Sequence, residues 1–300
     1  LASRLTPFLR EKDLLNINKD GVMMTRSLAE NYPYSRLFKA DMRGPFAEWI
    51  SIVDALEDGS MEPEPALNYL LSMLMNRSRK FGLIAEETCG LLAKVPDMTL
   101  EQVRDLLSSF YASTQYSARA FEVVIHGFMQ ALCGLDYTDL RLEPLSQMRS
   151  ANKKHGNVGG IEMKDGNLIV ESWDAKFGKP YLYEELSELK DKLDTHPGVR
   201  VAGFIVDDNL MLKKEIEERR DAYSAMTNVD IRLFNFVDWV GYQTEDLSPE
   251  QQSALAREWL RAVVETFARR REEIAPVDEP CENWLSDMKE LLKAITELPV

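Results

Sequence analysis

Residues 155–176 read HGNVGGIEMKDGNLIVESWDAK, and this stretch gives the clearest indication of the fold. Two β-rich runs, 158–163 and 167–174, are joined by the turn Lys164-Asp165-Gly166. An Asp-Gly pair between apolar runs is a strong short-range signal for a β-hairpin. The sequence therefore predicts a hairpin near the middle of the chain.

The residues after this hairpin alternate between helical and extended patterns. We expect helices over 181–193 and 210–227 and strands over 199–206 and 230–234. Strands that alternate with helices require a sheet with helices packed on it, and the hairpin adds an antiparallel pair. The predicted fold class is therefore α/β, with a mixed sheet core flanked by helices. The remaining C-terminal segments, 236–242, 248–274 and 282–298, are predicted to be helical.

The segment 45–133, which precedes the hairpin, is predicted to be helical. Apolar residues recur at helical spacing from 45 to 133, and Gly and Pro residues divide the segment into four predicted helices. We expect three regions: a helical N-terminal region over 1–114, a core over 115–245 that contains the hairpin, and C-terminal helices over 246–300 that pack on the core.

Composition limits the classes of function. The 300 residues carry a net charge of −14, which argues against binding nucleic acid through bulk electrostatics, yet the segment 148–179 is net positive. No apolar run approaches the roughly 20 residues that span a bilayer, and residues 1–10 show no secretory signal. The three cysteines lie far apart without metal-binding spacing. We therefore expect a cytoplasmic protein with no membrane partner.

Several side chains in and near the hairpin have the chemistry of a metal-dependent hydrolase. Strand alternation puts Asp174 and Lys176 on one face, and it puts Gly160 and Glu162 on one face of the neighbouring strand. Glu122 lies in an otherwise apolar helix, where an ionised carboxylate is unfavourable unless it meets a cation. Carboxylates are the protein ligands that Mg²⁺ prefers, and a lysine can steer the attacking water.

The hairpin sequence resembles the active-site hairpin of type II restriction endonucleases of the PD-(D/E)xK nuclease superfamily. Several of these carry a Gly-Asn-x-Gly-Asp strand followed by Asp-Ala-Lys, and the resemblance covers roughly residues 115–240. It implies that Asp174 binds Mg²⁺, that Lys176 positions or activates water, and that Glu122 assists. It also implies a nuclease core over 115–245, double-stranded DNA as the substrate, and a homodimer as the acting form, because a palindromic site matches a two-fold protein. The N-terminal region 1–114 would then contribute to dimerisation or to embracing DNA.

One position departs from the family pattern. Gly160 stands where the first metal-binding aspartate is expected, and glycine has no side chain to bind a metal. Glu162 is the preferred substitute, as a second metal ligand and catalytic residue, because it lies two residues along the same strand. Asp165, in the turn, is the other candidate. Alternatively, Gly160 marks a catalytically disabled DNA-binding or assembly module of the same fold.

Basic and polar residues around the hairpin are the candidate DNA contacts. They are Arg149, Lys153, Lys154, His155, Asn157 and Lys179. Their position beside the hairpin favours contacts with phosphate groups, although charges between elements are often only solvated. A third possibility for the activity is a repair or mobile-element nuclease that recognises DNA structure instead of sequence.

Overall fold

The computed structural model describes residues 45–145, 157–269 and 281–297. Contacts divide the chain into two compact units, Leu1–Leu83 and Ile84–Val300. The first unit holds α3 (Phe46–Glu57) and the first part of α4 (Pro63–Leu92). The sheet and the later helices belong to the second unit. The N-terminal region predicted from the sequence ends at residue 114.

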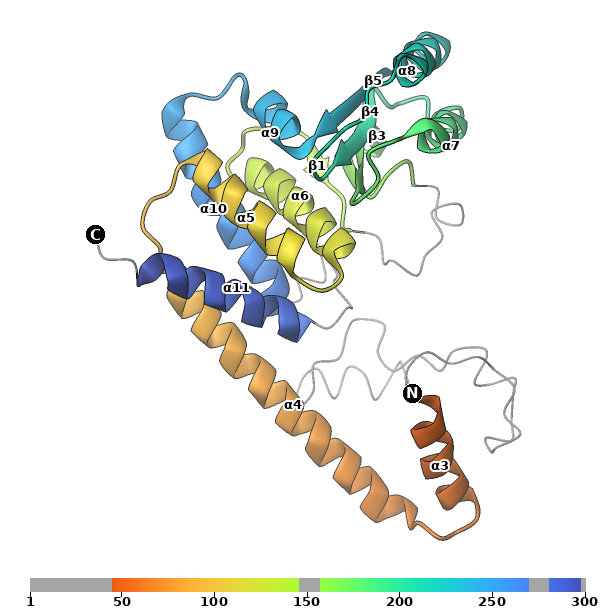
Figure 1. The fold of residues 1–300 in the computed structure, drawn as a ribbon, viewed down its shortest axis with the longest axis vertical. Coiled ribbons are helices and arrows are strands. Elements are labelled where there is room, and N and C mark those ends of the chain that lie inside the picture. The colour runs from red at the N-terminus through yellow and green to blue at the C-terminus, as the bar shows by residue number, and fades with distance from the viewer. Residues whose placement is uncertain (1–44, 146–156, 270–280, 298–300) are drawn as a thin grey trace. The chain divides into compact units, whose positions relative to one another are not determined.

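The second unit contains a mixed sheet of five strands in the order β1-β2-β3-β4-β5 (Figure 1). β1, β2 and β3 pair antiparallel, whereas β3, β4 and β5 pair parallel. The predicted hairpin is present, with Gly166 in its turn at a φ of +57°, a conformation that glycine adopts easily. The strands are β1 (Arg141–Leu142), β2 (Ile161–Asp165), β3 (Leu168–Lys176), β4 (Val201–Val206) and β5 (Asp230–Asn235). The predicted mixed α/β sheet is confirmed.

Helices cover both faces of this sheet. The four helices predicted between residues 45 and 133 are all present, the last two being α5 (Leu100–Ser113) and α6 (Ser117–Gly134). Thr99 caps α5, because its hydroxyl accepts from the Gln102 amide while its own amide donates to the Gln102 side chain. The remaining helices are α7 (Tyr183–Leu193), α8 (Lys214–Thr227), α9 (Phe236–Thr244), α10 (Pro249–Arg269) and α11 (Cys281–Thr296). No helix in the described ranges is both long enough and apolar enough to cross a membrane.

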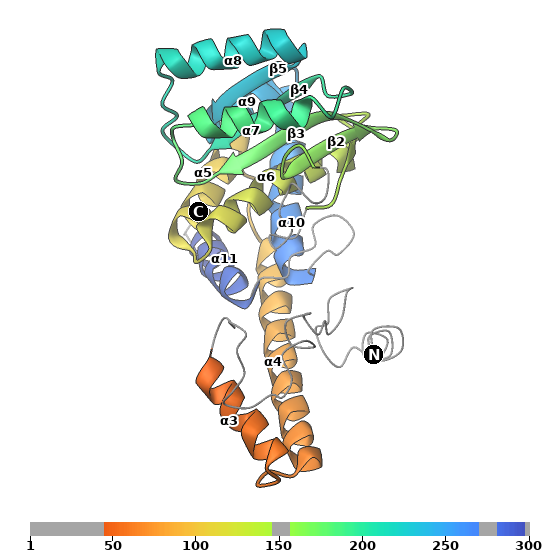
Figure 2. The ribbon, with the colours of Figure 1, turned by 90° about the vertical axis from the view of Figure 1, so that its right-hand side faces the viewer.

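The two faces of the sheet bury different side chains. α7 and α8 lie on one face, where leucines of α7 pack against Ala202, Phe204 and Val206 of β4 (Figure 1). α6 and α9 lie on the other face, and α10 packs against α6 (Figure 2). There the rings of Trp173 and Trp239 are 6.2 Å apart. Because side chains alternate along a strand, Asp174 and Lys176 project from the face opposite to Trp173, toward α7.

Gly203 on β4 is required by close packing. A Cβ atom there would overlap the carbonyl oxygen of Arg232 and lie 3.0 Å from the Trp173 ring. We expect Gly203→Ala to lower the free energy of unfolding by about 3 kcal/mol, because a backbone oxygen cannot move aside without disturbing the sheet. Urea denaturation measures this. The matched control is Gly241→Ala on α9, where a Cβ meets no atom within 4 Å and helix propensity favours alanine. Equal effects of the two substitutions would contradict this interpretation.

His126 on α6 makes stability depend on pH. Its Nε2 lies 3.0 Å from the carbonyl oxygen of Glu143, so Nε2 donates, and Nδ1 has no hydrogen-bond partner among the described residues. Burial lowers the pKa of His126 to about 4 from the ordinary 6.5, so the folded chain favours the neutral ring.

The stability that comes from this neutral ring is fully present above pH 6.5 and is lost as the pH falls toward 4. We expect this loss to reach about 3 kcal/mol. His126→Gln keeps a donor toward Glu143 without a titrating ring. We therefore expect the free energy of unfolding of the unsubstituted chain to fall, relative to that of His126→Gln, as the pH is lowered over this range. Chemical denaturation of both chains measures this difference. A constant difference would contradict the assignment.

Candidate active site

Asp174 and Lys176 form an ion pair near the end of β3. The Lys176 Nζ lies 2.9 Å from the Asp174 Oδ2, and the side chains of Lys176 and Asp174 are 23% and 18% exposed. Parallel pairing with β4 places them beside Phe204 and Val206. The side-by-side arrangement that strand alternation predicted is therefore observed, and solvent or a substrate group can reach it.

The two glycines before β2 bring the chain against β3. A Cβ atom on Gly159 would lie 2.7 Å from the carbonyl oxygen of Trp173, so only glycine allows this approach. The strand register pairs Ile161 with Trp173. Gly160 lies just before this paired part of β2, and a Cβ atom on it would point at the Glu122 side chain of α6.

Glu122 fills the space above Gly160. Its Oε1 atom occupies the position that a Cβ atom of residue 160 would need. Its Oε2 atom accepts a hydrogen bond of 2.7 Å from Arg119, which is buried. Burial raises the pKa of Glu122, the nearby charge of Asp174 raises it further, and Arg119 and Lys176 oppose the shift. α6 therefore places a carboxylate against Gly160, close enough to Asp174 and Lys176 for their charges to act on its pKa.

Glu162, the expected substitute ligand, has a different environment. Its Oε1 atom accepts hydrogen bonds from the backbone amides of Val158 and Gly159, at 2.6 and 3.4 Å. The side chain is buried, and desolvation raises its pKa despite these bonds. Glu162 therefore holds the glycine loop against the sheet. Asp165 is exposed at the other end of β2, away from Gly160.

The rest of the site comes from α7, which the sequence analysis did not single out. A small hollow beside Asp174 is lined by Val158, Asp174, Lys176, Glu185, Glu188, Leu189, Lys192 and Phe204. Lys192 donates a hydrogen bond of 2.9 Å to the carbonyl oxygen of Val158. Glu185, Glu188 and Lys192 are spaced by three and four residues, so they share one face of α7. This spacing was the available signal in the sequence.

The candidate DNA contacts divide into two groups. Arg149, Lys153, Lys154 and His155 lie outside the described residues. Asn157 is half-buried beside Val158, and Lys179 is exposed and pairs with Glu185 at 3.0 Å. The described lining of the hollow carries two lysines and three carboxylates. The net positive charge of the segment 148–179 is therefore not reflected in the described lining of the hollow.

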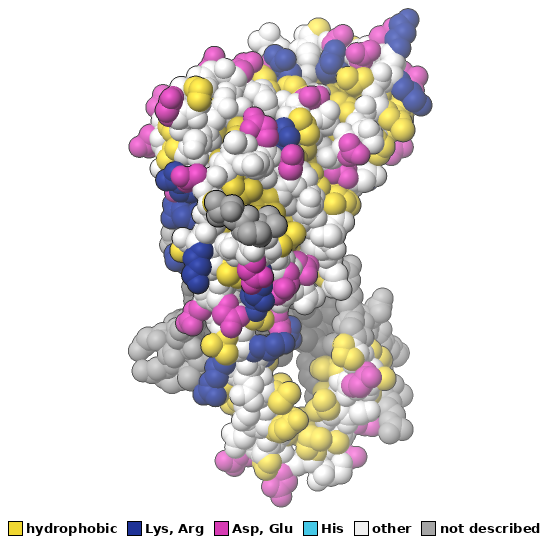
Figure 3. Space-filling model, turned by 60° about the vertical axis from the view of Figure 1, so that its left-hand side comes forward, with side chains coloured by type: hydrophobic (Ala, Val, Ile, Leu, Met, Phe, Trp, Pro, Cys, Tyr) yellow, Lys and Arg dark blue, Asp and Glu magenta, His cyan; other side chains and the backbone are white. Residues whose placement is uncertain are grey.

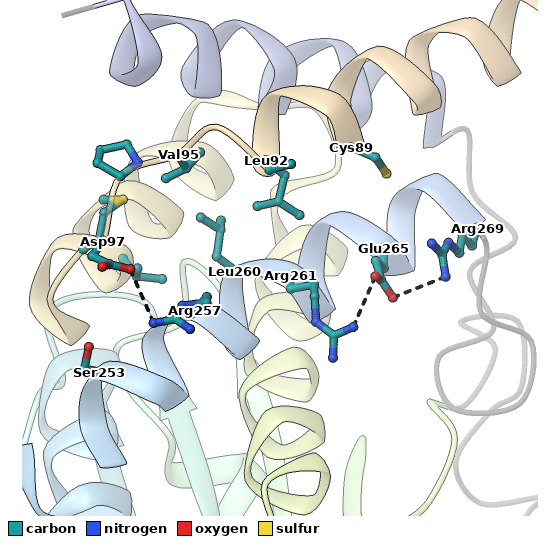
Figure 4. A pocket seen from close by; sticks show the side chains of 14 residues that line it. Cys89, Leu92, Val95, Asp97, Ser253, Arg257, Leu260, Arg261, Glu265 and Arg269 are labelled. Carbon is teal, nitrogen blue, oxygen red and sulfur yellow. Dashed lines mark hydrogen bonds and ion pairs between the residues drawn. The ribbon is translucent and has the colours of Figure 1, made fainter. Parts of the chain in front are cut away.

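A separate cavity of about 670 Å³ lies against α10 (Figure 4). Its walls combine apolar side chains, among them Leu92 and Leu260, with arginines that pair with acids. Arg257 lies 3.4 Å from Asp97, and Arg261 and Arg269 lie 3.5 and 3.7 Å from Glu265. This cavity shares no lining residue with the hollow at Asp174. It is therefore not part of the candidate active site.

Besides Asp174, the carboxylates near the ion pair are Glu185 and Glu188 of α7, which line the hollow, and Glu122 of α6. Among the described residues, no three His, Cys, Asp or Glu side chains gather closely enough to hold one by themselves. Mg²⁺ usually keeps several waters and binds through one or two carboxylates together with substrate phosphates. A Mg²⁺ ion at Asp174 would therefore need water and substrate oxygens to complete its shell.

Comparisons of the sequence with protein-family models and with curated proteins found no match. The interpretation of this site therefore depends on its own geometry and chemistry.

Proposed function

We propose that this chain is a Mg²⁺-dependent endonuclease that hydrolyses phosphodiester bonds of double-stranded DNA at a short specific sequence, as type II restriction endonucleases do. The observation that carries the proposal is the contact of Asp174 with Lys176 while Glu122 occupies the space above Gly160. The mixed sheet with helices on both faces is compatible with a restriction-endonuclease-like core. Such an enzyme would act in the cytoplasm as a homodimer.

Asp174 and Glu122 would hold the metal ion. When bound, Mg²⁺ polarises a phosphoryl oxygen and lowers the pKa of water. A cation also favours the ionised form of Glu122, whose pKa is raised by burial. Arg119 keeps one oxygen of Glu122 fixed, so it is a positioning residue.

Lys176 would act on the water and on the phosphate. Its ammonium group can donate hydrogen bonds to the attacking water and can balance the negative charge that builds on the phosphoryl group. Asp174 holds this group in place at 2.9 Å. Lys192 and Glu162 fix the glycine loop from its two sides, through the carbonyl and amide groups of Val158.

The test is cleavage of a long DNA of known sequence by the full chain with Mg²⁺, with a chelator as the control. Discrete fragments that are lost with the chelator are expected. A smear that lacks discrete fragments would favour a nuclease that recognises DNA structure. DNA binding without cleavage would favour a second candidate, the disabled module of the same fold, for which the glycine at 160 is the specific observation.

A further inference from the structure

Lys192 of α7 differs from the other partly buried lysines that the structure describes. Each of the others pairs with a carboxylate, and these are Lys164, Lys176, Lys190, Lys289 and Lys293. On the face of the molecule drawn in Figure 3, Lys and Arg side chains likewise lie interspersed with Asp and Glu side chains. Lys192 forms no ion pair with the described residues, and its Nζ donates a hydrogen bond of 2.9 Å to the carbonyl oxygen of Val158. The positive charge of Lys192 therefore has no carboxylate partner in this part of the chain.

The carboxylates that line the hollow together with Lys192 leave its charge available. Asp174 and Glu185 each pair with another lysine, at 2.9 and 3.0 Å. Glu188 lies one turn before Lys192 on α7, but it is exposed, and the ammonium group contacts Val158 instead. An ammonium group has three hydrogen-bond donors, and Val158 takes one of them. An anionic group at the hollow can therefore bind to the remaining donors of Lys192.

The position of Lys192 relates this charge to the proposed reaction. Lys192 lines the same hollow as Asp174 and Lys176, which act on the cleaved phosphate in the proposed function. Each DNA strand carries one negative charge per nucleotide, so a strand bound at Asp174 brings a neighbouring phosphate to the surroundings of the hollow. A lysine is a compact charge with rotatable donors, which suits contact with a phosphate group.

We propose that Lys192 is a substrate-binding residue, and that its ammonium group binds a DNA phosphate next to the one that is cleaved. The inference rests on the proposed function and adds a residue that holds the DNA without acting on the cleaved bond. Lys176 acts on the cleaved phosphate, whereas Lys192 contributes to affinity. The hydrogen bond to Val158 keeps the Lys192 side chain in place for this contact.

The first test measures how the affinity of the full chain for duplex DNA depends on salt, with Ca²⁺ in place of Mg²⁺. Lys192→Met is expected to weaken binding about fivefold near physiological salt and to lower the slope of log affinity against log salt concentration by about 1, because one phosphate contact is lost. Lys192→Arg keeps the charge and is expected to keep the slope. The matched control is Lys190→Met on the same helix, because Lys190 pairs with Asp194.

The slope separates phosphate binding from a purely structural role of Lys192. If this lysine only held Val158 in place, Lys192→Met would weaken binding by the same factor at every salt concentration. A slope that Lys192→Met leaves unchanged would therefore overturn the proposal, whatever the loss of affinity.

The second test uses the unsubstituted chain and does not depend on cleavage. Lysines are acetylated with N-hydroxysuccinimidyl acetate, and mass spectrometry measures the rate at each position. Duplex DNA with Ca²⁺, at about ten times its dissociation constant, is expected to slow acetylation of Lys192 about tenfold, because the ammonium group is then free in about a tenth of the molecules. The rate at Lys190 is expected to stay the same.

The outcomes distinguish this inference from the proposed function. A chain that cleaves DNA, and whose Lys192 reacts equally fast with and without DNA, would overturn the inference and leave the proposed function standing. A parallel reaction contains inorganic phosphate alone. Protection by inorganic phosphate but not by DNA would indicate a site for a free phosphate compound and would overturn the assignment to DNA. A chain that shows neither protection nor cleavage would overturn both proposals.

Discussion

Lys176→Ala is expected to lower Mg²⁺-dependent cleavage of duplex DNA by about 1000-fold. The ammonium group lies 2.9 Å from the Asp174 carboxylate and is the lysine that lines the hollow from β3. Removing a positioned group that orients water and balances charge on the phosphoryl group typically lowers a rate by about 10²–10⁴-fold. Single-turnover cleavage of a plasmid at saturating Mg²⁺ measures the chemical step directly.

The control for this substitution is Lys214→Ala on α8. Lys214 is exposed and pairs with Glu218 at 3.3 Å, outside the hollow. Loss of one lysine from the surface is expected to leave the cleavage rate within about twofold. Binding of Lys176→Ala to the same DNA, measured with Ca²⁺ in place of Mg²⁺, separates a lost chemical step from lost affinity. Cleavage by Lys176→Ala at the rate of the unsubstituted chain would rule out the proposed role of this lysine.

Glu122→Ala is expected to abolish cleavage, and Gly160→Asp in the same chain is expected to restore part of it. The Glu122 carboxylate stands where a side chain at residue 160 would project, so the two positions offer a carboxylate to the same space. Glu122→Ala removes one of two metal-binding carboxylates, with an expected loss of at least about 100-fold. The same substitution opens the room that an aspartate at 160 needs. Mg²⁺ titrations of cleavage by the single and double variants measure loss and recovery.

The matched control for the recovery is Gly160→Ala in the Glu122→Ala chain. It adds the same Cβ atom without a carboxylate, so the chain is expected to stay inactive. Recovery by alanine would show that space at 160, and not charge, limits the variant. The disabled module would be supported by a different result. In that case the unsubstituted chain would not cleave DNA, and Gly160→Asp would gain cleavage while Glu122 is still present.

Much of the framework could be predicted from local sequence. The turn at Asp165-Gly166, the alternation of Asp174 and Lys176, and the helix start at Thr99 all depend on neighbours within a few residues. Such features follow from backbone geometry and short-range hydrogen bonds, which a single segment contains. Element ends differed by a few residues: the helix expected from 181 begins at Tyr183, and the strand expected from 199 begins at Val201.

Patterns in the amino-acid sequence were sufficient to predict the hairpin, the mixed sheet and the pairing of Asp174 with Lys176. Which glutamate lies near Asp174 and Lys176 could be seen only in the tertiary structure. Glu162 lies two residues from Gly160 on the same strand, but its long side chain turns back to the amides of Val158 and Gly159. Glu122 reaches the site from α6, and Lys192 reaches it from α7. The physical reason is that the packing of helices against a sheet fixes contacts between distant segments, and no local pattern records that packing.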